Sequence, residues 1–156
     1  MDYLLLKTLH IVSSTFLWGT GVGTAFFMLV AHLNGDASAI RVTTRTVVYA
    51  DWLFTTPTII IQPVTGILLM NQMQFPMTST WFYVVVGLYA LMTICWLPVV
   101  YLQYRMKLAT EGLVTGDLLP PVYYRCMRWW VTLGVPAAVA MVSLFFLMVY
   151  KPWIAG

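Results

Sequence analysis

The apolar residues of this chain fall into four long runs that short polar segments separate. The runs cover residues 4–33, 47–72, 81–106 and 128–150. Each run is longer than the ~20 residues with which an α-helix crosses the hydrocarbon core of a bilayer. The runs are continuously apolar, whereas the strands of a membrane barrel alternate between apolar and polar residues. The pattern therefore predicts an all-α, integral membrane four-helix transmembrane bundle, which forms a single domain over residues 1–156.

Composition indicates lipid surroundings for this bundle. Hydrophobic residues make up 61% of the chain and charged residues only 8%, whereas a soluble domain is about half apolar and about a quarter charged. In water such a chain would expose large apolar patches, so the lipid bilayer is its first predicted partner. The chain has no cluster of Lys and Arg with interleaved aromatics, and no nucleic-acid partner is expected. Cys95 and Cys126 lack a CxxC spacing and are expected to be unpaired thiols.

The basic residues predict the orientation of the spans. The first run carries Lys7 and His10 and is too long for the apolar part of a signal peptide, so we expect it to be retained. Lys7 and Lys151 lie on one side of the predicted bundle. The other side holds most of the cations: Arg41, Arg45, Arg105, Lys107, Arg125 and Arg128. The positive-inside rule then predicts a multi-pass protein of the bacterial inner (cytoplasmic) membrane with both termini in the periplasm.

Both histidines of the chain, His10 and His32, lie in the first run. As part of one helix they would be on the order of 33 Å apart, yet within about 40° of each other around its axis. The residues that share this helix face are Ser14, Leu17, Gly21 and Met28. Because polar groups in a span are costly, the stripe is predicted to face the bundle interior or a cavity.

A neutral imidazole is a good axial ligand for haem iron, which makes His10 a candidate metal ligand. Two histidines this far apart on one helix cannot bind a single iron from opposite sides. A haem would therefore need a different second ligand, or a second copy of the chain. The alternative is that both histidines are interfacial and only form hydrogen bonds with loops.

A second polar cluster is predicted near the cytoplasmic face. Asp51 should lie at a depth similar to that of His32, Gln103 and Arg128. An ion pair between Asp51 and Arg128 or His32 would offset the cost of burying either charge. Such a cluster either pins the helix ends together or forms a proton or substrate site, and the sequence leaves both alternatives open.

Glycines and prolines interrupt the first two runs. Gly19 and Gly23 form a GxxxG pair, which is typical of close helix packing, including that of a homodimer. The alternative is that the glycines leave room for a flat ligand. Pro57 and Pro63 are predicted to kink the second helix near the middle of the membrane. Gln62 lies between them and either links two helices or contacts a ligand.

Long segments of the chain resemble an uncharacterised family of predicted bacterial integral membrane proteins. These segments are LLLKTLHIVSSTFLWGTGVGTAFFMLVAH, ADWLFTTPTIIIQPVTG, CWLPVVYLQYRMKL and MVYKPW, and the likeness covers nearly the whole length. This resemblance implies a membrane protein but no particular activity.

Shorter motifs resemble, more distantly, the HemJ-type membrane protoporphyrinogen IX oxidases, which are small four-helix proteins with haem b. The shared positions are Lys7 and His10, Trp18-Gly19, His32, Arg128, Val135-Pro136 and Lys151-Pro152. Gly134 stands where that family has a glutamate, and the third helix lacks the lysine of that family. The resemblance implies the four-helix bundle and a bound haem b.

Together these patterns favour a small haem-b-binding membrane redox protein, similar to protoporphyrinogen oxidase, that exchanges electrons with a quinone. His10 would bind the metal, Ser14 and Gly21 would border the porphyrin, and Lys7 and Lys151 would hold its propionates. No soluble-type catalytic motif is present, so the catalytic residues stay unassigned. The alternative is a cofactor-free membrane subunit, transporter or chaperone, in which the polar cluster is structural.

Overall fold

A computed structural model of the protein describes residues 2–150, and all regular secondary structure within them is helical. The elements are α1 (Tyr3–Asn34), α2 (Ala37–Ala50), the π-helical segment η1 (Asp51–Thr55), α3 (Thr56–Gln72), α4 (Thr80–Thr110) and α5 (Pro121–Tyr150). Because α2, η1 and α3 are continuous, the described residues form four helical stretches that are long and apolar enough to span a membrane. The predicted all-α membrane bundle is confirmed.

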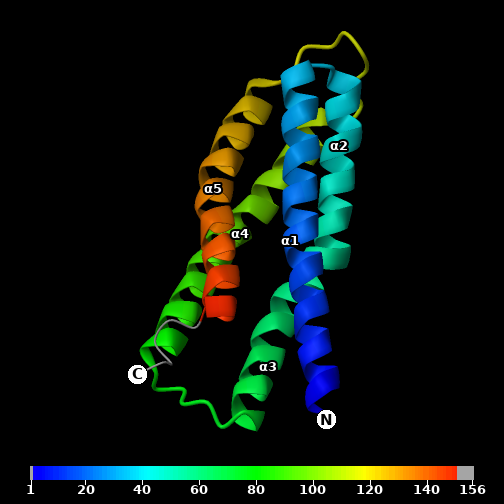
Figure 1. Cartoon of the computed structure of the whole chain (residues 1–156). Coiled ribbons are helices and arrows are strands. Elements are labelled where there is room, and N and C mark those ends of the chain that lie inside the picture. Colours follow the sequence, from blue (N-terminus) through cyan, green and yellow to red (C-terminus); the bar gives the residue numbers. More distant parts are fainter. Residues whose placement is uncertain (1, 151–156) are drawn as a thin grey trace.

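The two ends of the bundle differ in charge. The α1–α2 and α4–α5 connections lie at one end, and the α3–α4 connection lies at the other end with the N-terminus (Figure 1). We call the first of these the basic end, because six cations gather there: Arg41, Arg45, Arg105, Lys107, Arg125 and Arg128. Of the lysines and arginines that the structure describes, only Lys7 lies at the other end.

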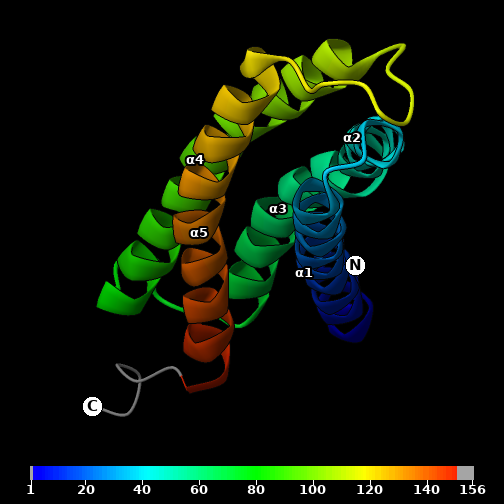
Figure 2. The ribbon, with the colours of Figure 1, turned by 90° about the horizontal axis from the view of Figure 1, so that it is seen from above.

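The helices form two groups that meet only in part. In one group α4 and α5 pack against each other along most of their length, and in the other α1 packs against α2, η1 and α3. Figure 2 shows the α4–α5 pair at a distance from α1. The groups are joined near the basic end by contacts between α2 and α4, which include a 3.0 Å hydrogen bond between the buried hydroxyls of Thr44 and Thr110. The backbones of α1 and α5 stay apart, and the two helices meet through side chains, such as the rings of Trp18 and Phe145 with centres 5.9 Å apart.

Buried side chains gather in two clusters rather than in one continuous core. The cluster near the basic end consists of Met28, Ala31, Ile40, Val47, Val99, Met106, Tyr123, Cys126, Met127 and Trp130. The second cluster lies farther from the basic end and consists of Leu17, Met92, Ala140, Met141 and Leu144. The packing therefore loosens between the two clusters, in the middle of the bundle.

The second span begins earlier than the sequence predicts, at Ala37 instead of residue 47. Gly35 ends α1 in the left-handed conformation, with a φ of 72°. Asp36 then caps the next helix, because its carboxylate accepts hydrogen bonds from the backbone N–H groups of Ser38 and Ala39. The capped helix continues outside the apolar run, and an apolar run reveals only the part of a helix that lies in lipid.

The same correction applies to the third connection. Helix α4 continues to Thr110 instead of residue 106, and α5 begins at Pro121 instead of residue 128. Proline suits the first position of a helix, because its missing N–H has no intrahelical partner there. The connection is therefore shorter than the apolar pattern indicates.

The predicted kink of the second span falls at η1, just before Pro57. Proline lacks an N–H donor, and its ring collides with the carbonyl group four residues earlier in a regular helix. A wider π-helical turn relieves this conflict. In η1 the N–H group of Thr56 reaches back five residues to the carbonyl of Asp51. Helix α3 then continues in a different direction from α2 (Figure 1).

Pro63 leaves another backbone carbonyl without its helical donor, that of Ile59. The hydroxyl of Tyr89 on α4 donates a hydrogen bond to this carbonyl oxygen. Because unsatisfied carbonyls are costly in lipid, this contact fixes α3 against α4.

We expect Tyr89→Phe to destabilise the bundle by about 1 kcal/mol, the usual scale of an interhelical hydrogen bond in a membrane protein. The free energy of unfolding can be measured in mixed detergent micelles. The cost should shrink in a Pro63→Ala background, because alanine at this position would return an N–H group to the Ile59 carbonyl. The control is Tyr83→Phe, since Tyr83 is exposed. An equal cost of Tyr89→Phe in both backgrounds would contradict this account.

Candidate functional site

A cavity of about 460 Å³ lies in the middle of the bundle, where the two buried clusters separate. Its walls come from α1 and α5, and its floor comes mainly from η1 and α4. The volume falls within the range of about 300–1,000 Å³ that is typical of small-molecule sites. We call it the intramembrane cavity.

The intramembrane cavity faces lipid on one side. All of its exposed lining residues lie on α1 and α5, the two helices whose backbones stay apart. They include Val22 and Phe26 on α1, and Val131 and Val135 on α5. Phe26 is 61% exposed and Val135 is 58% exposed. These four apolar side chains form the mouth of the cavity. Because the mouth is apolar, it opens to the hydrocarbon of the bilayer instead of the aqueous phase.

Two glycines widen the cavity, Gly21 on α1 and Gly134 on α5. A Cβ atom added to either glycine would have no neighbouring atom within 4 Å. Bare backbone thus forms part of each wall. Gly21 was predicted to border a ligand, whereas Gly134 attracted attention only as a departure from the HemJ-type pattern.

Unpartnered polar atoms concentrate around this cavity. Within residues 2–150, four buried side-chain nitrogen or oxygen atoms lack a hydrogen-bond partner: Asp51 Oδ2, Gln103 Oε1, Trp96 Nε1 and Trp130 Nε1. The four residues that carry them all line the intramembrane cavity. Buried polar groups are nearly always hydrogen-bonded, so four exceptions in one place call for a physical reason.

Asp51 and Gln103 lie close together at the floor of the cavity. Each is 4% exposed. The Oδ1 atom of Asp51 accepts a 2.8 Å hydrogen bond from the hydroxyl of Thr55, one turn farther along η1. The Gln103 amide on α4 lies near the same carboxyl group, but Asp51 Oδ2 and Gln103 Oε1 remain without partners. Of the described residues that line the cavity, Asp51 is the only one of a charged type.

The other two members of the predicted cytoplasmic cluster lie elsewhere. His32 is half-buried. Its Nδ1 atom lies 3.2 Å from the Tyr123 hydroxyl oxygen, and the His32 ring also contacts the Tyr124 ring. Arg128 is exposed. The structure therefore brings Asp51 and Gln103 together, but it joins neither His32 nor Arg128 to them within the described residues.

His10 belongs to a different polar network, between α1 and α3. Its Nδ1 atom lies 2.7 Å from the Thr65 hydroxyl, and that hydroxyl donates a 2.7 Å bond to the carbonyl of Ile61. Because the Thr65 proton is used in that bond, we assign His10 Nδ1 as the donor, which leaves Nε2 with a free lone pair. This tautomer suits a metal ligand whose other ring nitrogen is held by a second group.

Gln62 completes this network by linking the two helices. Its Nε2 atom donates hydrogen bonds to the His10 carbonyl, at 2.7 Å, and to the Ser13 hydroxyl, at 2.6 Å. Of the two predicted roles of Gln62, the link between helices is therefore the one that the structure contains. Ser13 and Thr65 had no place in the sequence prediction, because hydroxyls in spans usually bond only to their own helix.

The residues predicted to surround a porphyrin do not converge. Lys7 is exposed, with its Nζ atom 5.7 Å from the centre of the Tyr3 ring. Ser14 donates a 2.7 Å hydrogen bond to the Ile11 carbonyl of its own helix. Gly21 lines the cavity, whereas His10 does not. The two residues are about 16 Å apart along α1. Lys151 lies outside the described residues.

The sequence pattern assigned no lining role to the indoles of Trp96 and Trp130, and Trp18 on the facing wall entered only through the HemJ-type resemblance. Trp96 lies in the middle of α4. Tryptophan in membrane proteins is enriched at the two interfaces with water. A tryptophan at mid-span is therefore the signal that could have indicated an interior site.

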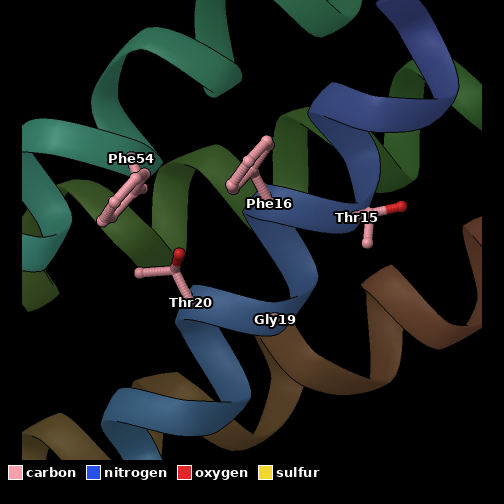
Figure 3. A pocket seen from close by; sticks show the side chains of 5 residues that line it. All are labelled: Thr15, Phe16, Gly19, Thr20 and Phe54. Atoms are coloured by element: carbon pink, nitrogen blue, oxygen red, sulfur yellow. The ribbon is translucent and has the colours of Figure 1, made fainter. Parts of the chain in front are cut away.

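A second, smaller hollow of about 270 Å³ lies where α1 meets η1, and Figure 3 shows the side chains around it. The rings of Phe16 and Phe54 stack there with centres 5.7 Å apart. Gly19 also lines this hollow. A Cβ atom on Gly19 or Gly23 would meet nothing within 4 Å. In the described part of the chain, the GxxxG pair therefore packs against no other helix.

These features define a class, an integral membrane bundle of four spanning stretches with a cavity in its interior. The model of the family DUF2269, described as a predicted integral membrane protein, matches residues 4–152. The chain belongs to this family, as the longer sequence resemblance predicts. No curated protein and no solved structure matches the chain. The comparisons give no link to the HemJ-type oxidases.

We expect Gln62→Leu to destabilise the protein by about 1–2 kcal/mol, because it removes two hydrogen bonds and leaves Ser13 Oγ without a donor. Unfolding in mixed micelles would measure this change. Ser13→Ala should cost less in the Gln62→Leu background than alone, since the two residues share a bond. Ser143→Ala is the matched control, because Ser143 bonds only to a carbonyl of its own helix. Additive costs of Gln62→Leu and Ser13→Ala would refute the coupling.

Proposed function

We propose that this protein binds a lipid-soluble small molecule in the intramembrane cavity. The observation that carries the proposal is the coincidence of four unpartnered polar atoms with the lining of one cavity. Two of the atoms are indole donors and two are oxygen acceptors. A ligand with a large apolar body and a few polar groups would complement both the walls and these atoms after small side-chain rotations.

The size of the cavity supports the presence of an occupant. A cavity of about 460 Å³ lies within the range of about 300–1,000 Å³ that is typical of small-molecule sites. Because its mouth opens to hydrocarbon, either a lipid tail or a ligand would fill this space in the membrane, and the unpartnered polar atoms favour a ligand.

The mouth indicates the route to the site. Val22, Phe26, Val131 and Val135 are apolar and exposed between α1 and α5. A molecule dissolved in the bilayer can pass between these side chains without crossing a charged or hydrated surface. The ligand would therefore reach the site sideways from lipid.

The proposed setting is the bacterial inner membrane, with the basic end in the cytoplasm and both termini in the periplasm. The six cations at the basic end support this orientation through the positive-inside rule. In this setting the protein would act as a cofactor-free membrane subunit, a transporter or chaperone that holds or passes on its ligand. The scarcity of acid–base side chains among the described lining residues supports binding rather than catalysis.

The test uses a neutral, apolar fluorescent probe, N-phenyl-1-naphthylamine, added to the protein in lipid nanodiscs. We expect energy transfer from tryptophan to the bound probe, because three tryptophans line the cavity. Gly134→Leu should fill the cavity and raise the Kd of the probe, taken from the saturable signal, at least about tenfold, which corresponds to about 1.4 kcal/mol of binding free energy.

Gly87→Leu is the matched control. Gly87 is also a helical glycine with open space around its missing Cβ, but it does not line the cavity. Its signal should equal that of the unmodified protein. Equal signals from Gly134→Leu and Gly87→Leu would mean that the probe dissolves in lipid only, and the proposal would fail.

A second candidate function is a haem-b protein with His10 as axial ligand, which would pass electrons to or from a quinone. The free Nε2 lone pair of His10 supports it. The intramembrane cavity does not fit a haem held in this way, because its described lining contains no histidine or cysteine. A haem at His10 would have to lie outside the cavity, and we derive no reaction step through it.

The optical spectrum tests this second candidate. Protein expressed with ample haem and purified in detergent should show a Soret band that His10→Ala removes. His32→Ala should leave the band in place, because His32 is held by tyrosines at the basic end. A colourless preparation, or a band that His10→Ala leaves unchanged, would exclude His10 as the ligand.

A further inference from the structure

One carboxyl group lies among the cavity walls without a cation. Among the residues that the structure describes, Asp51 is the only acidic one that lines the intramembrane cavity, and no Lys, Arg or His lines it. The Oδ2 atom of Asp51 has no hydrogen-bond partner. An ionised side chain inside a membrane is costly unless an opposite charge lies nearby. Residues 2–150 supply no such charge at this place.

Aromatic faces surround the same space. Trp18, Trp96 and Trp130 line the cavity from three different helices, and Phe26 stands at its mouth. The electron-rich face of an aromatic ring attracts a cation, and tryptophan attracts it most strongly. This attraction is greatest where water is excluded. A carboxyl group within an aromatic enclosure is a combination that suits a positively charged ligand.

The mouth limits the kind of cation. A small, strongly hydrated ion would have to shed its water and find several oxygen ligands. Of the described lining residues, only four have side-chain oxygens: Thr24, Asp51, Thr55 and Gln103. Thr24 and Thr55 already donate hydrogen bonds within the protein. The cation must therefore be one whose charge is shielded by apolar groups, so that it is soluble in the bilayer.

We infer that the ligand of the intramembrane cavity is a lipophilic organic cation, whose charge pairs with Asp51 and whose apolar groups contact the tryptophans. This inference rests on the proposed function and specifies its ligand class. Asp51 would provide the charge selectivity, and the aromatic walls with the two glycines would provide the shape. The indole N–H groups and Gln103 would hold any oxygen or nitrogen atoms that the cation carries.

Two ions of nearly identical shape and opposite charge give a direct test on the unmodified protein. Tetraphenylphosphonium and tetraphenylborate are each used to displace N-phenyl-1-naphthylamine from the protein in nanodiscs. We expect the cation to displace the probe at a concentration at least about tenfold lower than the anion, after correction for the lipid partitioning measured with Gly134→Leu.

Variants of the cavity wall refine this test. Asp51→Asn should weaken tetraphenylphosphonium binding about 30-fold or more, the loss expected when one partner of a buried charge pair is removed. Asp51→Glu should retain most of the preference for the cation, which separates loss of charge from loss of fold. Trp130→Leu should also weaken tetraphenylphosphonium binding. Trp129→Leu should leave this binding unchanged, because Trp129 is exposed and lies outside the cavity.

The outcomes separate this inference from the proposed function. If the neutral probe binds in the cavity but the anion displaces it as well as the cation does, the charge inference is overturned and lipid-soluble binding stands. The same conclusion follows if Asp51→Asn retains the preference for the cation. If the neutral probe does not bind in the cavity at all, the proposed function itself is wrong.

Discussion

Hydrocarbon offers no water to a polar group, and this constraint decides where the polar side chains of the bundle lie. Most hydroxyls in the spans bond to a carbonyl one turn earlier on their own helix, as Thr8, Thr93 and Ser143 do. Other polar side chains hold two helices together, as the Gln62 amide does between α1 and α3. The few buried atoms that remain without a partner thereby become informative, because the rest of the bundle satisfies its polar groups so consistently.

Proline shows how the same constraint shapes the backbone. Pro63 removes a helical donor, and a tyrosine from α4 provides a replacement. Pro57 changes the helix itself, because the turn ahead of it widens into η1. Asp51 begins that wider turn and lines the cavity. π-Helical turns are rare and frequently occur at functional sites. A single proline thus accounts for both the bend of the second span and the placement of its only carboxylate.

The sequence was sufficient for the four spans, because a run of about 20 apolar residues is long enough to cross a bilayer and too apolar for water. It could not give the beginnings of α2 and α5, since those turns lie outside the apolar runs and depend on capping by Asp36 and on Pro121. Within the site, Asp51, Gln103 and Gly21 stood out as polar or small residues in a span. Trp96, Trp130 and Gly134 did not, because an apolar side chain or a glycine reveals its role only when the facing helix is known.

The same limit applies to the histidines. Helical periodicity places His10 and His32 on the inner face of α1, and both are indeed half-buried. Their partners, however, are Thr65 and Tyr123, which are 55 and 91 residues away in the chain. The periodicity of one helix does not predict which residues of another helix it contacts. The expected convergence of His32, Asp51 and Arg128 therefore rested only on their similar depth in the membrane. Depth in the membrane is readable from sequence, whereas direction around the bundle is not.

The distance between the α1 and α5 backbones beside the intramembrane cavity has a cause in the solvent. In water, the hydrophobic effect would favour closing the gap between two apolar helices. In a bilayer that drive is absent, because lipid tails are as apolar as the side chains, and close packing depends on van der Waals contact instead. An acyl chain could therefore fill the intramembrane cavity as well as a ligand, as far as volume is concerned. It could not satisfy the Asp51 carboxyl, the Gln103 amide or the two indoles, and this difference between apolar and polar complementarity is what favours a specific occupant over a lipid tail.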